Sequence, residues 1–193
     1  MMDGHVTLVF LDESGFNTTP HVRRTWAPVG LTPSFRHPFT WHKLSVISAV
    51  TSNGQMFFRI HQKKSVKDVD IVNFLRQMLN QIEGKIILYL DGLPQHKSKK
   101  MKKFISKHDR LDVRRLPAYS PDMNPDEGVW SYVKTKMLPN LSIKSTKDLK
   151  KRVKSSLHRL QKRKNLIISF LLHAELPWDD ESRNMLYYTY KAQ

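Results

Sequence analysis

The first part of the chain alternates short apolar runs with polar turn residues, a pattern typical of strands. Val6–Leu11 is apolar and leads into Asp12-Glu13-Ser14-Gly15, so we expect a buried strand that a turn stops at Asp12. Residues 43–50 and 55–60 flank Ser52-Asn53-Gly54, and Asn-Gly between two strand-like runs favours a hairpin. The chain is therefore predicted to open with about three antiparallel strands.

From Asp68 the spacing of apolar positions becomes that of a helix. Apolar residues recur at steps of three and four, namely Val69, Val72, Leu75, Leu79 and Ile82. Gly84 is expected to end this helix, and the apolar run Lys85–Leu90 predicts a strand buried on both faces that stops at Asp91. The elements expected next are a basic helix over 98–107, a short strand over 111–114, a loop over 117–125 and a helix over 126–137.

The last quarter of the chain has a different character. One apolar stripe at helical spacing is surrounded by Lys and Arg, and its members are Leu149, Val153, Leu157 and Leu160. A further apolar stretch at 166–172 predicts a second helix or a bend in the first. We therefore expect a core over 1–140 and a basic helical segment over 141–193 that packs on it. The fold class predicted is α/β, a mixed sheet with helices on both faces.

The charge balance narrows the choice of partners. Lys and Arg number 33 against 17 Asp and Glu, a net charge of +16, which favours DNA, RNA or an acidic membrane surface as the partner. A solubilising surface is the alternative interpretation. The absence of cysteine excludes disulfides, thiolate zinc sites and cysteine nucleophiles. With no run of eighteen apolar residues and no signal-peptide pattern, the expected location is inside the cell.

Three acids occupy positions where an α/β sheet carries chemistry. Asp12 follows the first strand, Asp91 follows the buried fourth strand, and Glu127 begins a helix. If the first and fourth strands are neighbours, Asp12 and Asp91 face one another, and close carboxylates favour a cation between them. Mg²⁺ or Mn²⁺ takes oxygen ligands, and phosphodiester cleavage can use two such ions. The acids therefore predict a site for two metal ions beside bound phosphates.

Each acid also has a purely structural interpretation. Asp12 could cap a turn, and Asp91-Gly92 is a common turn pair. The stretch Asn124-Pro125-Asp126-Glu127 is close to a capping box, in which Glu127 would serve the helix start. Further acids lie within a few residues of the chosen ones, namely Glu13, Asp122 and Asp126.

Three motifs around these acids resemble a known family. Phe10–Phe16 (FLDESGF), Leu90–Ser98 (LDGLPQHKS) and Leu116–Trp130 (LPAYSPDMNPDEGVW) are similar, in that order, to the three acidic motifs of mariner-superfamily transposases, in the bacterial insertion-sequence branch. Arg24, Trp26 and Gly30 are placed like the Arg-x-Trp-x-x-x-Gly stretch of that family. The second motif departs from the family, which usually has Asn where Gly92 stands. The resemblance covers roughly residues 6–165.

The resemblance implies a fold, an activity and partners. The fold would be ribonuclease-H-like, and Asp12, Asp91 and Glu127 would be the DDE residues that hold two Mg²⁺ or Mn²⁺ ions. The activity would be metal-dependent nicking at transposon ends, followed by strand transfer into target DNA. Such transposases carry an N-terminal helix-turn-helix recognition region, which we expect to lie outside this chain. A bacterial cytoplasmic location is expected, and a homodimer is left open.

Other residues are candidates for contacts with DNA. Basic and aromatic side chains near the motifs are expected to meet phosphates or to stack on bases, and they are Arg23, Arg24, Trp26, His96, Lys97, Lys99 and Lys100. Trp26 is equally compatible with a core position, and Trp130 is expected to pack its helix onto the sheet. Two alternative functions are an inactive or domesticated DNA-binding module and a nuclease of the ribonuclease H or resolvase type.

Overall fold

The computed structural model describes residues 6–19, 24–32, 34, 43–62, 65–139 and 143–191. A five-stranded sheet forms its centre, in the order β3-β2-β1-β4-β5. The strands are β1 (Val6–Asn17), β2 (Lys43–Thr51), β3 (Met56–Gln62), β4 (Lys85–Leu90) and β5 (Leu111–Arg115). The apolar runs thus form the strands that their pattern predicted, including the hairpin between β2 and β3.

Strand direction changes across the middle of the sheet. The pairs β1–β2 and β2–β3 are antiparallel, whereas β4 runs parallel to β1, and β5 runs parallel to β4. The connection between the parallel neighbours β4 and β5 passes through a helix, the usual form of such a crossover. The predicted mixed sheet is confirmed, and its arrangement is that of a ribonuclease-H-like fold.

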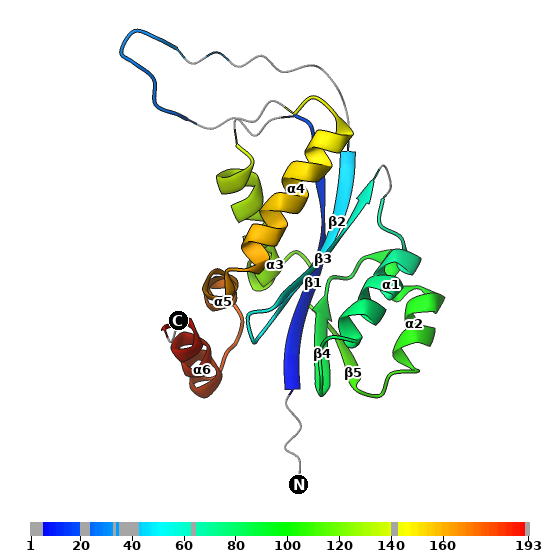
Figure 1. Cartoon of the computed structure of the whole chain (residues 1–193). Coiled ribbons are helices and arrows are strands. Elements are labelled where there is room, and N and C mark those ends of the chain that lie inside the picture. The colour runs from blue at the N-terminus through cyan, green and yellow to red at the C-terminus, as the bar shows by residue number, and fades with distance from the viewer. Residues whose placement is uncertain are drawn as a thin grey trace.

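Helices cover both faces of the sheet (Figure 1). They are α1 (Asp68–Leu79), α2 (Lys99–Ile105), α3 (Pro125–Tyr132), α4 (Thr146–Gln161), α5 (Lys164–His173) and α6 (Asp180–Lys191). Helices α1 and α2 share one apolar core with the sheet, and α3, α4, α5 and α6 share a second core on the opposite face. Because side chains alternate along a strand, β1 contributes Phe10 to the second core and Leu11 to the first.

Strand β1 does not stop where its sequence predicts a turn. It continues through Asp12-Glu13-Ser14-Gly15 to Asn17, paired with β2 as far as Asn17↔Lys43. The prediction was wrong because the backbone groups of these polar residues are satisfied by a neighbouring strand, which local turn chemistry does not anticipate. As a consequence, Asp12 and Glu13 point to opposite faces of the sheet.

The tail forms separate helices rather than one bent helix. The stripe Leu149, Val153, Leu157 and Leu160 is buried, in a core shared with the sheet. Helix α6 lies within the helical segment expected over 141–193, but no apolar stripe delimited it, since Met185, Tyr187 and Tyr188 leave much of its apolar surface exposed. The predicted boundary at residue 140 lies outside the described residues. No helix in the described part of the chain has the length and apolar character needed to cross a membrane.

Candidate active site

The sheet brings the first two acids of the motifs side by side. In the parallel pair β1–β4, Phe10 lies opposite Tyr89. Asp12 and Asp91 each follow two positions later along the chain. On its other side Asp12 lies opposite Ser48 of β2. Asp12 therefore sits within the sheet, with strand neighbours on both sides, and Asp91 follows the end of β4 beside it.

The carboxylate of Asp12 lies under helix α3. Trp130 donates a hydrogen bond from Nε1 to Asp12 Oδ2 at 2.9 Å, and the Trp130 ring is almost fully buried, edge-on to Phe16. Burial raises the pKa of Asp12 to about 7, although the bond from Trp130 opposes the shift; the charge of Glu127 adds to it. A nearby cation would therefore strongly favour the ionised form of this carboxyl group.

Asp126 is the most deeply buried acid of the third motif. Its side chain has no exposed surface, and it accepts a hydrogen bond from Ser48 Oγ at 2.5 Å. Burial raises the pKa of Asp126 well above its ordinary value, and the charge of Asp12 raises it further. Asp126 thus anchors the first turn of α3 against β2 and β1.

Glu127 follows this anchor and is exposed to solvent. Asn124 caps α3 by accepting a hydrogen bond from the backbone N–H of Asp126 at 3.2 Å. In a capping box Glu127 would accept from the backbone N–H of Asn124, but that N–H donates to the carbonyl of Pro121 at 2.9 Å. The capping interpretation of Glu127 therefore fails, and its carboxylate stands at the start of α3, close enough for its charge to raise the pKa of Asp12.

Asp91 and Glu13 are joined by one histidine. Nδ1 of His96 lies 2.7 Å from Asp91 Oδ1, and its Nε2 lies 3.0 Å from Glu13 Oε1. Burial disfavours the charged form of His96, but the two carboxylates outweigh it and raise its pKa to about 10. Burial also works against the Asp91 carboxylate, yet the bonds from His96 and from the backbone N–H of Leu93 hold its pKa below the ordinary value. The Leu93 bond is the turn contact that Asp91-Gly92 predicted.

The residues expected to contact DNA are placed in different ways. Arg23 lies outside the described residues, while Arg24 and Trp26 are exposed in an irregular segment, with Trp26 99% exposed. The alternative core position of Trp26 is thus wrong. His96 is buried between two carboxylates and is better placed to hold Asp91 than to meet a phosphate. The exposed lysines of this set are Lys97, Lys99 and Lys100, the last within 3.4 Å of Asp68.

Two polar residues at the site carried no signal in the sequence. Ser48, in the middle of β2, bonds Asp126, and Lys134, after α3, donates to Ser14 Oγ at 2.7 Å. A serine within an apolar strand and a lysine on a helix surface are both common, so only the fold reveals these contacts. Lys134 brings a positive charge to the same face of β1 as Asp12, because Ser14 lies two residues along the strand.

The donor set suits a divalent cation. Asp12, Asp91 and Glu127 offer carboxylate oxygens, the ligands that Mg²⁺ and Mn²⁺ prefer. The two bonds to Asp91 from His96 and Leu93 both reach Oδ1, and 40% of the Asp91 side chain is exposed. In the described part of the chain no three His, Asp or Glu side chains are already gathered at metal-binding distances. The fit therefore rests on donor chemistry and on the shared location of the acids.

Comparison with known proteins agrees with this arrangement. The family of DDE superfamily endonucleases matches residues 7–150. The structure is similar to "Mos1 transposase paired-end complex with left transposon end", with 16% identity and a TM-score of 0.59 over 87% of this chain and 56% of that one. It is also similar to "Crystal structure of the mariner Mos1 paired end complex with Mg", with 16% identity and a TM-score of 0.60 over 84% and 55%.

This chain thus spans little more than half of those Mos1 chains, and at such identity the likeness concerns the fold. No curated protein matches the sequence. The family match covers most of the chain and includes Asp12, Asp91 and Glu127, and the fold agrees with it. The chain belongs to the DDE superfamily endonucleases.

Proposed function

We propose that this chain is the catalytic domain of a transposase that cleaves DNA and transfers the cut strand with the help of two divalent metal ions. The observation that carries the proposal is the approach of β1, the end of β4 and the start of α3 to one another, which would place Asp12, Asp91 and Glu127 near a shared cation. Charge coupling between Asp12 and Glu127 supports their proximity, and the β1–β4 register supports that of Asp12 and Asp91.

The three carboxylates are the proposed metal ligands. Bound Mg²⁺ or Mn²⁺ would activate the attacking water or hydroxyl and stabilise the leaving oxygen of the phosphodiester. Structures of Mos1 proteins with Mg and with Mn support the choice of metal. The chain's own contribution is to hold oxygens of like charge close together, which is unfavourable unless a cation joins them.

Neighbouring residues position the ligands. Trp130 fixes one oxygen of Asp12 through its N–H, and the pair of His96 with Glu13 fixes one oxygen of Asp91. Asp126 and Asn124 hold the first turn of α3, so that Glu127 starts from a defined backbone. Such supporting contacts are usually worth one to two orders of magnitude, about 10–100-fold, in metal affinity or activity.

DNA is the proposed substrate, as transposon ends and as target. Support comes from the net charge of +16 and from the similar Mos1 structures, one a paired-end complex with a left transposon end and one a strand transfer complex. Recognition of specific ends is assigned to a helix-turn-helix region, as the resemblance to mariner-superfamily transposases implies. A homodimer and a bacterial cytoplasmic location complete the proposal.

A plasmid-nicking assay tests the function directly. Wild-type protein is expected to convert supercoiled DNA to nicked circles with Mg²⁺ or Mn²⁺, and to bind without cutting in Ca²⁺. Asp91→Ala and Glu127→Gln should lose nicking by about 1,000-fold, because a ligated metal supplies several kcal/mol of transition-state stabilisation. Matched controls are Asp109→Ala and Glu83→Gln, which remove exposed acids elsewhere and should nick like wild type.

The same assay separates the alternative functions. Variants at Asp91 and Glu127 that nick as well as wild type would refute the assignment of the acids. Binding without any metal-dependent cleavage would favour a DNA-binding module. Cleavage confined to the RNA strand of an RNA–DNA hybrid would favour a ribonuclease H.

A further inference from the structure

Half of the net charge of the molecule lies on one short segment. Residues 146–164 hold nine Lys and Arg and a single acid, Asp148, which is a net +8 of the total +16 in about a tenth of the chain. We call this segment the basic ridge, and its cations are Lys147, Lys150, Lys151, Arg152, Lys154, Arg159, Lys162, Arg163 and Lys164. It comprises helix α4 and the junction with α5.

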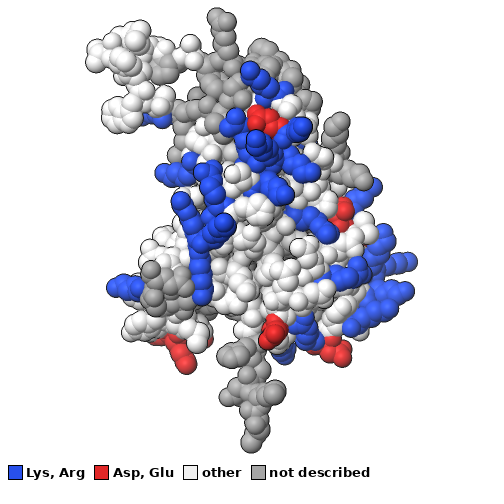
Figure 2. Space-filling model, viewed as in Figure 1, with Lys and Arg blue, Asp and Glu red and all other residues white. Residues whose placement is uncertain are grey.

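Four cations of the ridge follow one line along α4. Lys147, Lys151, Lys154 and Lys162 recur at helical steps, with His158 in the place between the last two, and all five are exposed. The opposite side of α4 is buried against the sheet. Figure 2 shows the Lys and Arg side chains gathered over the position of α4 in Figure 1.

Most of the charge of the ridge is not neutralised within the described residues. Arg152 pairs with Asp148 at 2.9 Å, one turn away, and the described carboxylates form no ion pair with the other eight cations. The apolar residues of α4 are buried, so the ridge presents charge without apolar side chains to insert into a lipid surface. A row of exposed cations of this kind suits a linear polyanion.

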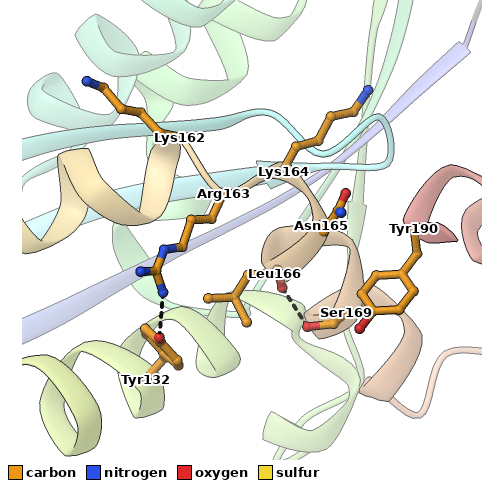
Figure 3. Close-up of a pocket in the computed structure, with 8 residues that line it drawn as sticks. All are labelled: Tyr132, Lys162, Arg163, Lys164, Asn165, Leu166, Ser169 and Tyr190. Atoms are coloured by element: carbon orange, nitrogen blue, oxygen red, sulfur yellow. Dashed lines mark hydrogen bonds between the residues drawn. The ribbon is translucent and has the colours of Figure 1, made fainter. Parts of the chain in front are cut away.

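A hollow of about 500 Å³ adjoins the end of the ridge. Figure 3 shows Arg163 reaching into it toward Tyr132 of α3, with Lys162 and Lys164 pointing apart at its rim. The Arg163 guanidinium donates to the Tyr132 hydroxyl at 2.9 Å, which orients it while leaving other N–H groups for an acceptor. Tyr190 of α6 and Ser169 of α5 also line the hollow, and none of the described residues that line it is an acid.

We propose that the basic ridge binds the phosphate backbone of duplex DNA outside the active site, an inference that rests on the proposed transposase function for the identity of the polyanion. A 16-residue helix such as α4 is about 24 Å long, the length of roughly 7 base pairs at about 3.4 Å each. Tyr132 and Glu127 share helix α3, so DNA on the ridge and DNA at the acids are held by one rigid element. The ridge supplies affinity, and the acids supply chemistry.

Binding measurements in EDTA test the ridge without any cleavage. The ridge variant replaces Lys147, Lys151, Lys154 and Lys162 by Gln, and the control replaces four exposed lysines outside the ridge, Lys85, Lys102, Lys103 and Lys107, by Gln. Both lose the same charge. With about 0.9 counterion released per phosphate contact, loss of four lysine contacts should reduce the slope of log K against log salt by about 3.6 and weaken duplex binding at least about tenfold. The control should change the affinity less than about twofold.

The outcomes show whether binding depends on the ridge or on net charge alone. They also separate DNA binding by the ridge from DNA cleavage by the acids. Equal losses in both variants, with circular dichroism spectra like wild type, would overturn the ridge as a specific surface. A ridge variant that loses single-stranded DNA and not duplex would overturn the assignment to duplex. Because the assay needs no metal, a wild-type protein that never nicks would refute the enzyme and leave the ridge result standing. Arg163→Lys, which shortens the reach to Tyr132, should weaken binding less than Arg163→Gln.

Discussion

Two adjacent acids on β1, Asp12 and Glu13, have different surroundings because they face opposite sides of the sheet. Asp12 faces α3, where its recorded side-chain partner is the neutral indole N–H of Trp130, and its pKa rises to about 7 mainly through burial. Glu13 faces the other way and pairs with His96, whose pKa rises to about 10 as it holds Glu13 and Asp91 together. The side-chain partner of Glu13 is a cation, whereas that of Asp12 is neutral.

The different surroundings of Asp12 and Glu13 indicate different roles for the two acids. A buried acid paired with a protonated histidine is compensated within the protein and serves the fold. A buried acid close to further acids is tolerated poorly by the fold alone, and such groups cluster at functional sites. The Asp12 side of β1 is therefore the expected place of the reaction, and the Glu13 side is the expected support of Asp91.

The largest expected effect is the loss of DNA nicking on substitution of Asp12. Asp12→Asn should lower metal-dependent nicking by about 1,000-fold, because it removes a proposed ligand worth several kcal/mol. Glu13→Gln should lower nicking by only about 10–100-fold, since it loosens His96 without removing a ligand. Rates on supercoiled plasmid measure both, and equal losses would erase the distinction between the two acids.

The next effect concerns the stability of the compensated side. His96→Gln should lower the free energy of unfolding by about 3 kcal/mol, because a buried carboxylate at Glu13 loses its charged partner. Urea unfolding followed by circular dichroism gives the value. His173→Gln, at an exposed histidine, is the control and should change stability by less than about 0.5 kcal/mol. A loss at His96 no greater than the control would show that the His96–Glu13 pair is not structural.

A smaller effect is expected from the indole that holds Asp12. Trp130→Phe keeps a ring beside Phe16 but removes the donor to Asp12. It should therefore lower the free energy of unfolding by about 2 kcal/mol. Trp178→Phe is the matched control, because the Trp178 Nε1 donates to the neutral carbonyl of Leu171 at 3.2 Å. This variant should lower the free energy of unfolding by about 1 kcal/mol. Metal titration should also show weaker Mn²⁺ binding for Trp130→Phe alone.

The smallest effect concerns the turn after Asp91. A Cβ at Gly92 would meet only the Lys97 Nζ, at 3.6 Å, which is an ordinary contact. Gly92→Asn, the residue usual in the resembling family, should therefore change stability by less than about 0.5 kcal/mol. Thermal unfolding checks this value. A large loss would mean that the turn excludes side chains at this position.

Local patterns predicted most of the elements because each follows from a repeating chemical period. The Asn53-Gly54 hairpin, the helix from Asp68 and the buried stripe of α4 all lie where the apolar spacing indicated. The end of β1 was missed and helix α6 was not delimited, since a strand that carries polar residues and a helix with exposed tyrosines depart from the usual burial pattern. At the site, the motifs selected the acids, but neither the Ser48–Asp126 bond nor the bridge through His96 has a signature in the sequence.

By itself the sequence determined the identity and order of the acidic motifs, the periodic elements and the excess of positive charge. Only the tertiary structure decided that Asp12 and Glu13 part to opposite faces, that Asp126 is buried while Glu127 is exposed, and that His96 faces inward. The physical reason is that local spacing sets the direction of a side chain along its own element. Burial, partners and pKa depend on which distant elements pack against it, and here those are α3 and the turn after β4.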